Sequence, residues 1–171
     1  MIFVTVGTHE QQFNRLIQQI DKLKGEGIIT EDVIIQTGYS TYEPKNCEWK
    51  NLLPYEKMVE CVEKARIVIT HGGPSSFIMP LQIGKTPIVV PRQHKFNEHV
   101  NDHQLNFTKA VAERMGTIIV VEDIETLGDV ITRYDEIVAG MKQGLESNNV
   151  RFNKELQKIV DEMFRTNKED V

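Results

Sequence analysis

The sequence predicts a single α/β domain, an open and mainly parallel sheet of five or six strands with helices on both faces. Short apolar runs of strand length alternate with segments of helical periodicity along the chain. The runs are apolar on both faces, which is typical of strands that helices cover on two sides. Glycine-containing turns follow several of the runs. Together these patterns predict a Rossmann-like sheet whose strands are joined by right-handed crossovers.

Five runs rich in Val, Ile and Thr predict the strands, at residues 2–6, 32–37, 66–70, 87–91 and 117–121. A further short strand is expected within residues 47–52. The segments between the runs have apolar residues at helical spacing, and we expect helices over residues 10–24, 55–65, 75–83, 97–115 and 123–140.

Beyond residue 142, the sequence predicts one more amphipathic helix. Its apolar side chains recur at helical spacing, at Phe152, Leu156, Ile159, Val160 and Phe164. We expect this apolar face to pack on the core rather than to bind a partner. The domain should then span residues 1–165, with a flexible charged tail over residues 166–171.

The composition excludes some classes of function. The 171 residues carry 20 Lys and Arg against 25 Asp and Glu, so no nucleic-acid partner held by bulk charge is expected. Cys47 and Cys61 lack metal-type spacing, and we interpret them as reduced structural residues. The chain opens directly into a predicted strand, and no apolar run approaches the ~20 residues of a membrane span. We therefore expect a cytoplasmic protein.

Ligands of an open parallel sheet bind beyond the carboxyl ends of its strands, near the point where the strand order reverses. Four loops follow predicted strands, at residues 7–12, 38–43, 71–76 and 92–104. All four are rich in Gly, hydroxyl, amide or His side chains. The functional residues are therefore expected in these loops.

The loop at residues 71–76, "HGGPSS", has the composition of an anion site. Gly72 and Gly73 allow the backbone to turn sharply and to approach a bulky anion. Pro74 suits the first position of a helix, which places Ser75 and Ser76 in the first turn. Free N–H groups and the helix dipole attract phosphate there. A plain turn between a strand and a helix is the alternative interpretation.

The first loop, "GTHEQQ", follows the same logic. Gly7 ends the first strand, and Thr8 is a candidate cap for a helix that begins near residue 10. Neither G-x-G-x-x-G nor G-x-x-x-x-G-K-[ST] occurs in the chain. Their absence argues against a dinucleotide-dependent dehydrogenase and against a P-loop NTPase.

The loop at residues 92–104 concentrates histidines, and three interpretations of it stay open. A zinc site would use His94, His99 and His103, two of which share a face if this segment is helical. A solvated start of a helix is the plainest alternative. In the third interpretation, Asp102 and Gln104 bind sugar hydroxyls while Arg92 or Lys95 offsets the charge of a diphosphate.

The segments "THGGPSS", "GKTPIVVP" and "EHVNDHQ" resemble the nucleotide-sugar-binding half of GT-B glycosyltransferases. The opening segment "MIFVTVGTHEQQFNRLI" is similar to the small donor-binding subunits of two-chain glycosyltransferases. These include the carboxyl-terminal-half subunit of the dolichol-linked N-acetylglucosaminyltransferase. The similarity is closer to the subunits of bacterial capsule and exopolysaccharide β-1,4-galactosyltransferases. The resemblance runs from Met1 to about Gln104 and implies a GT-B carboxyl-terminal half.

The resemblance also implies roles for individual residues. The donor diphosphate is expected to contact His71, Gly72, Gly73, Ser75, Ser76 and Arg92. The donor sugar and nucleoside are expected to contact Gly7, Thr8, Gly38, Gln82, Glu98, His99, Asp102, His103 and Gln104. Many relatives have a ribose-binding glutamate five residues before the position of Gly84, where this chain has Met79. Backbone groups or Gln82 are expected to take over that contact.

The activity implied by the resemblance is transfer of galactose from UDP-galactose to a lipid-linked saccharide in capsule or exopolysaccharide synthesis. No D-x-D motif occurs, so we expect inverting catalysis without a metal or cofactor, with helix N–H groups and cations stabilising the diphosphate. His9 is the local candidate for the general base, and a base from a partner is the alternative.

We also expect a partner, because the chain is long enough for only one half of a GT-B enzyme. This membrane-associated subunit would bind the acceptor and hold the chain at the inner face of the membrane. A non-catalytic UDP-sugar-binding scaffold and a UDP-N-acetylglucosamine transferase subunit are the alternative functions.

Overall fold

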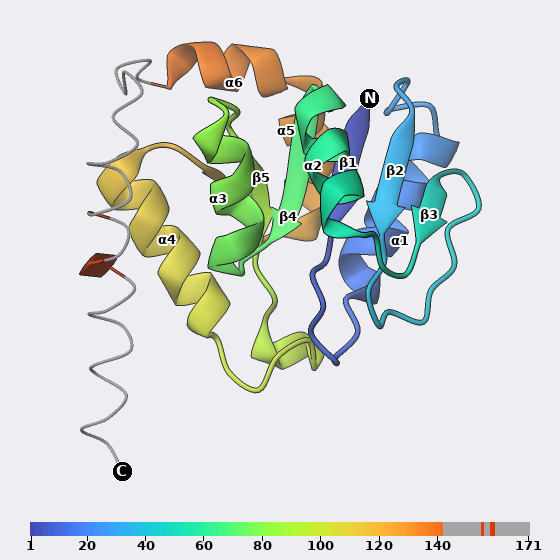
Figure 1. Cartoon of the computed structure of the whole chain (residues 1–171), viewed down its shortest axis with the longest axis horizontal. Coiled ribbons are helices and arrows are strands. Elements are labelled where there is room, and N and C mark those ends of the chain that lie inside the picture. The colour runs from blue at the N-terminus through green and yellow to red at the C-terminus, as the bar shows by residue number, and fades with distance from the viewer. Residues whose placement is uncertain (142–154, 156–157, 160–171) are drawn as a thin grey trace.

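Six parallel strands form one sheet in the computed structural model, which describes residues 1–141, 155 and 158–159 (Figure 1). Their order is β3-β2-β1-β4-β5-β6, and every neighbouring pair is parallel. The strands are β1 (Ile2–Thr5), β2 (Val33–Gln36), β3 (Glu48–Lys50), β4 (Ile67–His71), β5 (Ile88–Val90) and β6 (Ile119–Val120). The predicted α/β class and the sixth strand within residues 47–52 are confirmed.

Helices connect the strands, as the alternating pattern predicts, except that residues 37–47 join β2 to β3 without a helix. The α-helices of the described part are α1 (Asn14–Gly25), α2 (Tyr55–Lys64), α3 (Pro74–Gln82), α4 (His103–Met115), α5 (Leu127–Thr132) and α6 (Tyr134–Gly140). Two short 3₁₀-helices, η1 (His94–Phe96) and η2 (Ile124–Thr126), lie in the loops after β5 and β6.

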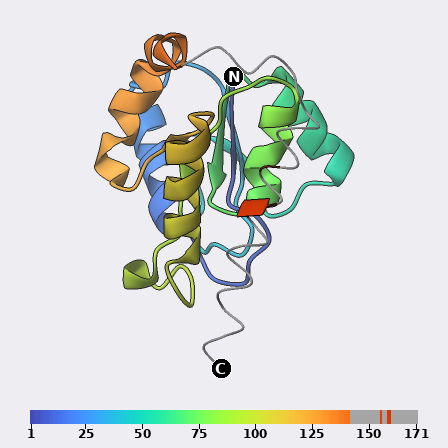
Figure 2. The ribbon, with the colours of Figure 1, turned by 90° about the vertical axis from the view of Figure 1, so that its left-hand side faces the viewer.

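The helices cover both faces of the sheet, which Figure 2 shows nearly edge-on. On one face, Leu16 of α1 and Leu127 of α5 belong to the largest buried apolar cluster. On the other face, Phe77 of α3 packs against Phe107 of α4 with ring centroids 5.9 Å apart, and Phe3 of β1 packs beneath α2. The central strands are therefore buried on two sides, which explains why their sequences are continuously apolar.

Helix α1 begins at Asn14 rather than at residue 10. The Asn14 side chain fixes this start, because its Oδ1 accepts hydrogen bonds from the N–H groups of Thr41 and Tyr42, at 3.0 Å each. Phe13 is the N-cap, so the hypothesis that Thr8 caps this helix is wrong. The residues from Gly7 to Phe13 form a loop beyond the carboxyl end of the central strand β1.

Helix α4 begins at His103 rather than at residue 97. Asn97 has a φ of 55°, a left-handed conformation that a right-handed helix does not accommodate. The segment from residue 97 to residue 102 is therefore a loop. The helix predicted over residues 123–140 is likewise divided into η2, α5 and α6, with a break at Arg133.

The helix predicted beyond residue 142 and the tail predicted over residues 166–171 lie outside the described residues, apart from residues 155 and 158–159. Of the apolar residues expected to pack on the core, Ile159 is described. It is 6% exposed and joins the cluster of Phe77 and Phe107. The domain boundary at residue 165 stays a prediction. Among the described helices, none has the length and apolar character that crossing a membrane requires.

Candidate functional site

The carboxyl ends of β1 and β4 lie side by side at the centre of the sheet. The two strands pair in register, with Thr5 opposite Thr70. The chain continues outward from β1 to β2 and β3 on one side, and from β4 to β5 and β6 on the other. The strand order therefore reverses between β1 and β4, where open parallel sheets bind their ligands. The loops that follow β1 and β4 both emerge at this reversal (Figure 1).

The imidazole of His71 lies between two glycines of these loops. A Cβ atom added at Gly7 or at Gly73 would overlap the His71 ring. Gly7 also has a φ of 73°, which disfavours any residue with a side chain. Both positions therefore need glycine because of His71. The sequence interpretation ascribed Gly73 to close approach of an anion, and the structure adds this packing reason.

His71 is 8% exposed, and its burial has an electrostatic consequence. Desolvation, together with the positive charge of Arg92, lowers the pKa of His71 to about 3. The ring is therefore neutral at neutral pH. In this state His71 can offer a diphosphate a hydrogen bond but not a positive charge.

Helix α3 starts directly after this turn. Gly73 is its N-cap and Pro74 is its first residue, as predicted from the sequence. Because the cap residue is a glycine, no side chain occupies the N–H groups of the first turn from that position. Ser75 is exposed and Ser76 is half-buried. Pro74 has no N–H group, and the N–H group of Ser76 donates to the carbonyl of Gly73 at 3.1 Å. The start of α3 thus offers an anion the N–H group of Ser75, the helix dipole and two hydroxyl groups.

Gln104 connects three parts of the site. Its side-chain oxygen accepts hydrogen bonds from the N–H groups of Gly72 and Arg92, at 3.1 and 3.2 Å. A Cβ atom at Gly72 would approach the Gln104 Cβ to 2.8 Å, so the glycine permits this contact. The Nε2 group of Gln104 makes no hydrogen bond within the described part of the chain. The residue therefore positions the turn with its oxygen and leaves its amide nitrogen for a ligand.

Arg92 was expected to contact the diphosphate, and the structure corrects this. The residue is 0% exposed. Its guanidinium donates hydrogen bonds at 2.8 to 3.1 Å to four backbone carbonyls, those of Val6, Gln11, Gln12 and Glu98. Burial lowers its pKa to about 10, so the group remains charged at neutral pH. Arg92 therefore fixes the loops from within and acts on the site through its field.

Glu98 also holds the loops instead of facing a sugar. The side chain is 1% exposed and forms a two-pronged ion pair with Arg15, at 2.8 and 2.9 Å. Its second oxygen also accepts a hydrogen bond from the N–H group of Gln93 at 3.0 Å. Its predicted contact with the donor sugar is therefore replaced by a positioning role.

His9 and His99 lie against each other beside the central loops, with ring centroids 4.9 Å apart. Burial, the charge of Arg92 and the neighbouring His99 lower the pKa of His9. The Nδ1 atom of His9 accepts a hydrogen bond from the N–H group of Gln11 at 3.1 Å. In the neutral ring, Nε2 therefore carries the proton. This arrangement makes His9 a hydrogen-bond donor and weakens its candidacy as a general base.

Asp102 and His103 lie at the start of α4, on the same edge as the glycine loops. Both are exposed, and an Asp102 oxygen accepts a hydrogen bond from the N–H group of His94 at 2.9 Å. Because residues 97–102 form a loop, His99 and His103 do not share a helical face. The described residues contain no group of three His, Cys, Asp or Glu side chains arranged for a metal ion. The zinc interpretation therefore gains no support.

The remaining predicted residues divide between the two ends of the sheet. Gly38 has a φ of 56° and lies against the loop of Gly7. A Cβ atom added at Gly38 would lie 2.6 Å from the carbonyl oxygen of Gly7. Thr8 is exposed in the adjacent loop. Gln82 is the last residue of α3, at the opposite end of that helix from the turn, which gives its predicted nucleoside contact no support. Met79 packs on the apolar cluster beneath α2.

Sequence reasoning missed the residues that position the site from a distance. Arg15 and Asn14 each bind a segment far away in the chain. The hydroxyl of Thr5 accepts a hydrogen bond from the N–H group of Gly7 at 3.2 Å, which fixes the first loop at the end of its strand. A Thr at the end of a strand, two residues before a conspicuous turn, is the one local signal that was available.

A comparison with protein families and curated proteins identifies relatives. The family model described as the glycosyltransferase family 28 C-terminal domain matches residues 1–163. The UDP-N-acetylglucosamine transferase subunit ALG13 of Homo sapiens is 36% identical over 117 residues, which cover 63% of this chain and 10% of that protein. The chain thus spans about a tenth of the length of this curated relative.

Two solved structures share the fold. The glycotransferase of kitacinnamycin matches with a TM-score of 0.53 and 18% identity over 92% of this chain and 37% of its own. The glycosyltransferase SnogD from Streptomyces nogalater matches with a TM-score of 0.56 and 17% identity over 92% of this chain and 39% of its own. At these identities the likeness establishes the fold alone. The chain spans well under half of each of these enzymes.

Proposed function

The chain belongs to the glycosyltransferase family 28 C-terminal domain family, and from this premise we propose that it is the donor-binding subunit of an inverting UDP-sugar glycosyltransferase. The observation that carries the proposal is the meeting of two glycine loops at the strand-order reversal, with the start of α3 beside them. That is where a Rossmann-like domain binds a nucleotide diphosphate.

In the proposed arrangement, the diphosphate lies over the start of α3. The N–H group of Ser75, the helix dipole and the hydroxyls of Ser75 and Ser76 stabilise its charge. These groups replace a divalent ion as the diphosphate leaves, which supports metal-independent transfer. The exposed Asp102 and the free amide nitrogen of Gln104 support contacts with the sugar hydroxyls.

We propose that a partner chain supplies the acceptor site and the general base. The Nδ1 atom of His9 is occupied by the N–H group of Gln11, so His9 is poorly placed to accept the proton of an acceptor hydroxyl. The curated relative that the chain resembles is itself described as a transferase subunit, which supports a role within a larger assembly. The partner would bind the lipid-linked acceptor and hold this subunit at the inner face of the membrane.

The donor sugar distinguishes two candidates. The motifs from Met1 to Gln104 favour UDP-galactose and a role in capsule or exopolysaccharide synthesis. The similarity to a protein described as a UDP-N-acetylglucosamine transferase subunit favours UDP-N-acetylglucosamine instead. Both candidates use the same diphosphate site, and they differ in the contacts that α4 makes with the hexose.

Isothermal titration of the purified chain with UDP and four UDP-sugars tests the proposal. The sugars are UDP-galactose, UDP-glucose, UDP-N-acetylglucosamine and UDP-glucuronate. We expect saturable binding of UDP and tightest binding of UDP-galactose; tightest binding of UDP-N-acetylglucosamine would select the second candidate. Failure of all five ligands to bind would contradict a donor-binding role. Full-rate transfer to a lipid-linked acceptor by this chain alone would contradict the need for a partner.

A further inference from the structure

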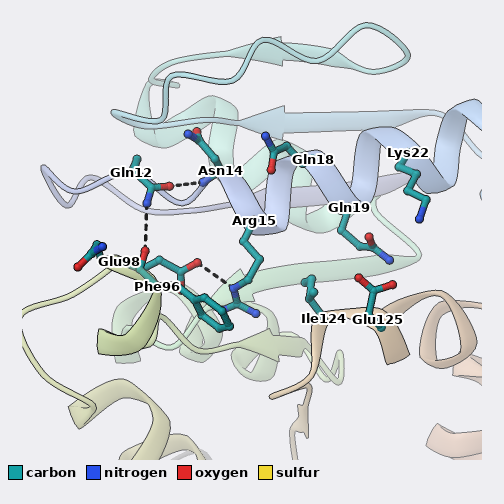
Figure 3. Close-up of a pocket in the computed structure, with 11 residues that line it drawn as sticks. Gln12, Asn14, Arg15, Gln18, Gln19, Lys22, Phe96, Glu98, Ile124 and Glu125 are labelled. Atoms are coloured by element: carbon teal, nitrogen blue, oxygen red, sulfur yellow. Dashed lines mark hydrogen bonds and ion pairs between the residues drawn. The ribbon is translucent and has the colours of Figure 1, made fainter.

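A cleft lies along α1 (Figure 3), and its lining includes no residue of the turn that starts α3. It has a volume of about 780 Å³ and is bounded by α1 on one side and by the segments around η1 and η2 on the other. Five of its 11 lining residues have carboxamide side chains, namely Gln12, Asn14, Gln18, Gln19 and Asn97. None of the proposed steps of glycosyl transfer uses this cleft.

The carboxamides differ in how far the protein already satisfies them. Asn14 and Gln12 are engaged, since each accepts a hydrogen bond from a backbone N–H group. The side-chain amides of Gln18 and Gln19, which lie within α1, make no hydrogen bond with any other described residue. Gln19 is only 8% exposed, and its amide points from α1 toward the side of the cleft formed by Ile124 and Glu125 (Figure 3). The Gln19 amide is thus reached from the cleft while the rest of the residue is buried, so it can hydrogen-bond a polar ligand there.

The charges of the cleft cancel. Arg15 is paired with Glu98 at 2.8 Å, and the remaining charged lining residues are one cation, Lys22, and one carboxylate, Glu125. The lining therefore has no net formal charge to select an anion or a cation. Each carboxamide without a partner supplies both hydrogen-bond donors and an acceptor. Hydroxyl groups also donate and accept, so this lining suits a neutral ligand rich in hydroxyl groups.

The cleft also has an apolar wall. Phe96 is 42% exposed at its rim, and the Arg15 guanidinium lies 4.7 Å from the centroid of its ring. Ile124 lies farther along the cleft (Figure 3). Apolar walls with a few convergent polar groups are the usual composition of small-ligand sites. A pyranose ring, with hydroxyls at its edge and C–H groups on its faces, matches this combination.

We propose that the cleft along α1 is a second saccharide-binding site, which takes a neutral hexose unit separately from the donor site. Gln18 and Gln19 hydrogen-bond the hydroxyls, and Phe96 contacts the apolar face of the ring. The proposal does not depend on the donor site, because no residue of the α3 turn lines the cleft.

Nuclear magnetic resonance of the ¹⁵N-labelled full chain, titrated with lactose or cellobiose, tests this proposal. We expect saturable shifts of the Gln18 and Gln19 side-chain amides, and about tenfold weaker binding for Gln19→Leu, the loss expected when a hydrogen bond to a ligand is removed. Gln18→Ala, at an exposed position, should weaken binding without affecting folding. The matched control is Gln82→Ala, at the exposed end of α3, which should bind the sugar like the unmodified chain.

Two outcomes would overturn the proposal. One is that neither lactose nor cellobiose causes saturable shifts at Gln18 and Gln19. The other is an equal response of the same amides to sodium sulfate, which would indicate an anion site. UDP titrations of the same variants separate this result from the donor site, since Gln19→Leu should leave UDP binding unchanged. A loss of UDP binding in Gln19→Leu would contradict the independence of the two sites.

Discussion

The side-chain oxygen of Gln104 accepts a hydrogen bond from the backbone N–H group of Gly72 at 3.1 Å. This bond fixes the start of α4 to the turn that precedes α3. The same oxygen accepts a bond from the N–H group of Arg92 at 3.2 Å, so one side chain joins the ends of β4 and β5. Gln104 is therefore a positioning residue. Its side-chain nitrogen is left to hydrogen-bond solvent or a donor sugar.

Gln104→Ala should lower both the stability of the fold and its affinity for UDP. Two backbone N–H groups would lose their acceptor, at a cost of about 1–3 kcal/mol in the free energy of unfolding. Gln104→Glu keeps an acceptor at this position and should be less destabilised, while it loses the amide donor to the sugar. Urea unfolding and isothermal titration measure the two effects. Equal stability of Gln104→Ala and the unmodified chain would contradict the bridging role.

Gly73→Ala should destabilise the protein through the His71 ring. An added Cβ atom overlaps the imidazole, and such overpacking costs about 1–3 kcal/mol. The effect should shrink in a His71→Ala background, because the ring is then absent. Gly140→Ala is the matched control, since nothing lies within 4 Å of its added Cβ atom. Additive effects of Gly73→Ala and His71→Ala in thermal unfolding would refute the proposed contact.

The stability of the protein should fall as the pH falls below about 6.5, in part because of His71. Burial lowers the pKa of His71 to about 3, so between these values the unfolded chain binds a proton that the folded chain does not. Stability therefore rises with pH in this window, by at most about 1.4 kcal/mol per pH unit from this residue. His71→Gln should have a shallower slope in urea unfolding from pH 6.5 to pH 4.5. Parallel slopes would show that His71 is protonated in the folded state.

Arg92→Lys should destabilise the protein although the charge is kept. A lysine ammonium cannot reach four carbonyls that a guanidinium engages, and the unsatisfied oxygens should cost at least about 2 kcal/mol in the free energy of unfolding. The matched control, Lys95→Ala, changes an exposed cation of the same loop and should shift stability by no more than about 0.5 kcal/mol. Retention of full stability in Arg92→Lys would assign Arg92 back to a ligand-facing role.

The elements that the sequence predicts well are those with local causes. The strands are apolar because helices cover both faces, and Pro74 marks the first residue of α3 through its fixed φ and missing N–H group. The placement of the glycine loops directly after strands follows from the same alternation and requires only neighbouring residues to be interpreted. The strand order, and with it the reversal between β1 and β4, comes from the structure.

The errors arise from contacts between distant segments. The start of α1 depends on Asn14 binding residues 41 and 42, and the role of Arg92 depends on carbonyls as far away as Val6. A loop arginine beside a predicted diphosphate site resembles a ligand contact in sequence, and its complete burial shows only in three dimensions. The neutral state of His71 likewise depends on desolvation by residues that its own segment does not reveal.

Titration of the ¹⁵N-labelled chain with UDP, followed through the backbone amides, is the decisive test of the proposed donor site. We expect saturable shifts that are largest at Gly72, Gly73, Ser75 and Ser76, with smaller shifts at Gly7 and none at the α1 cleft. If UDP at saturating concentration moved no amide of the turn that starts α3, or moved only residues elsewhere, the proposed donor site would be contradicted.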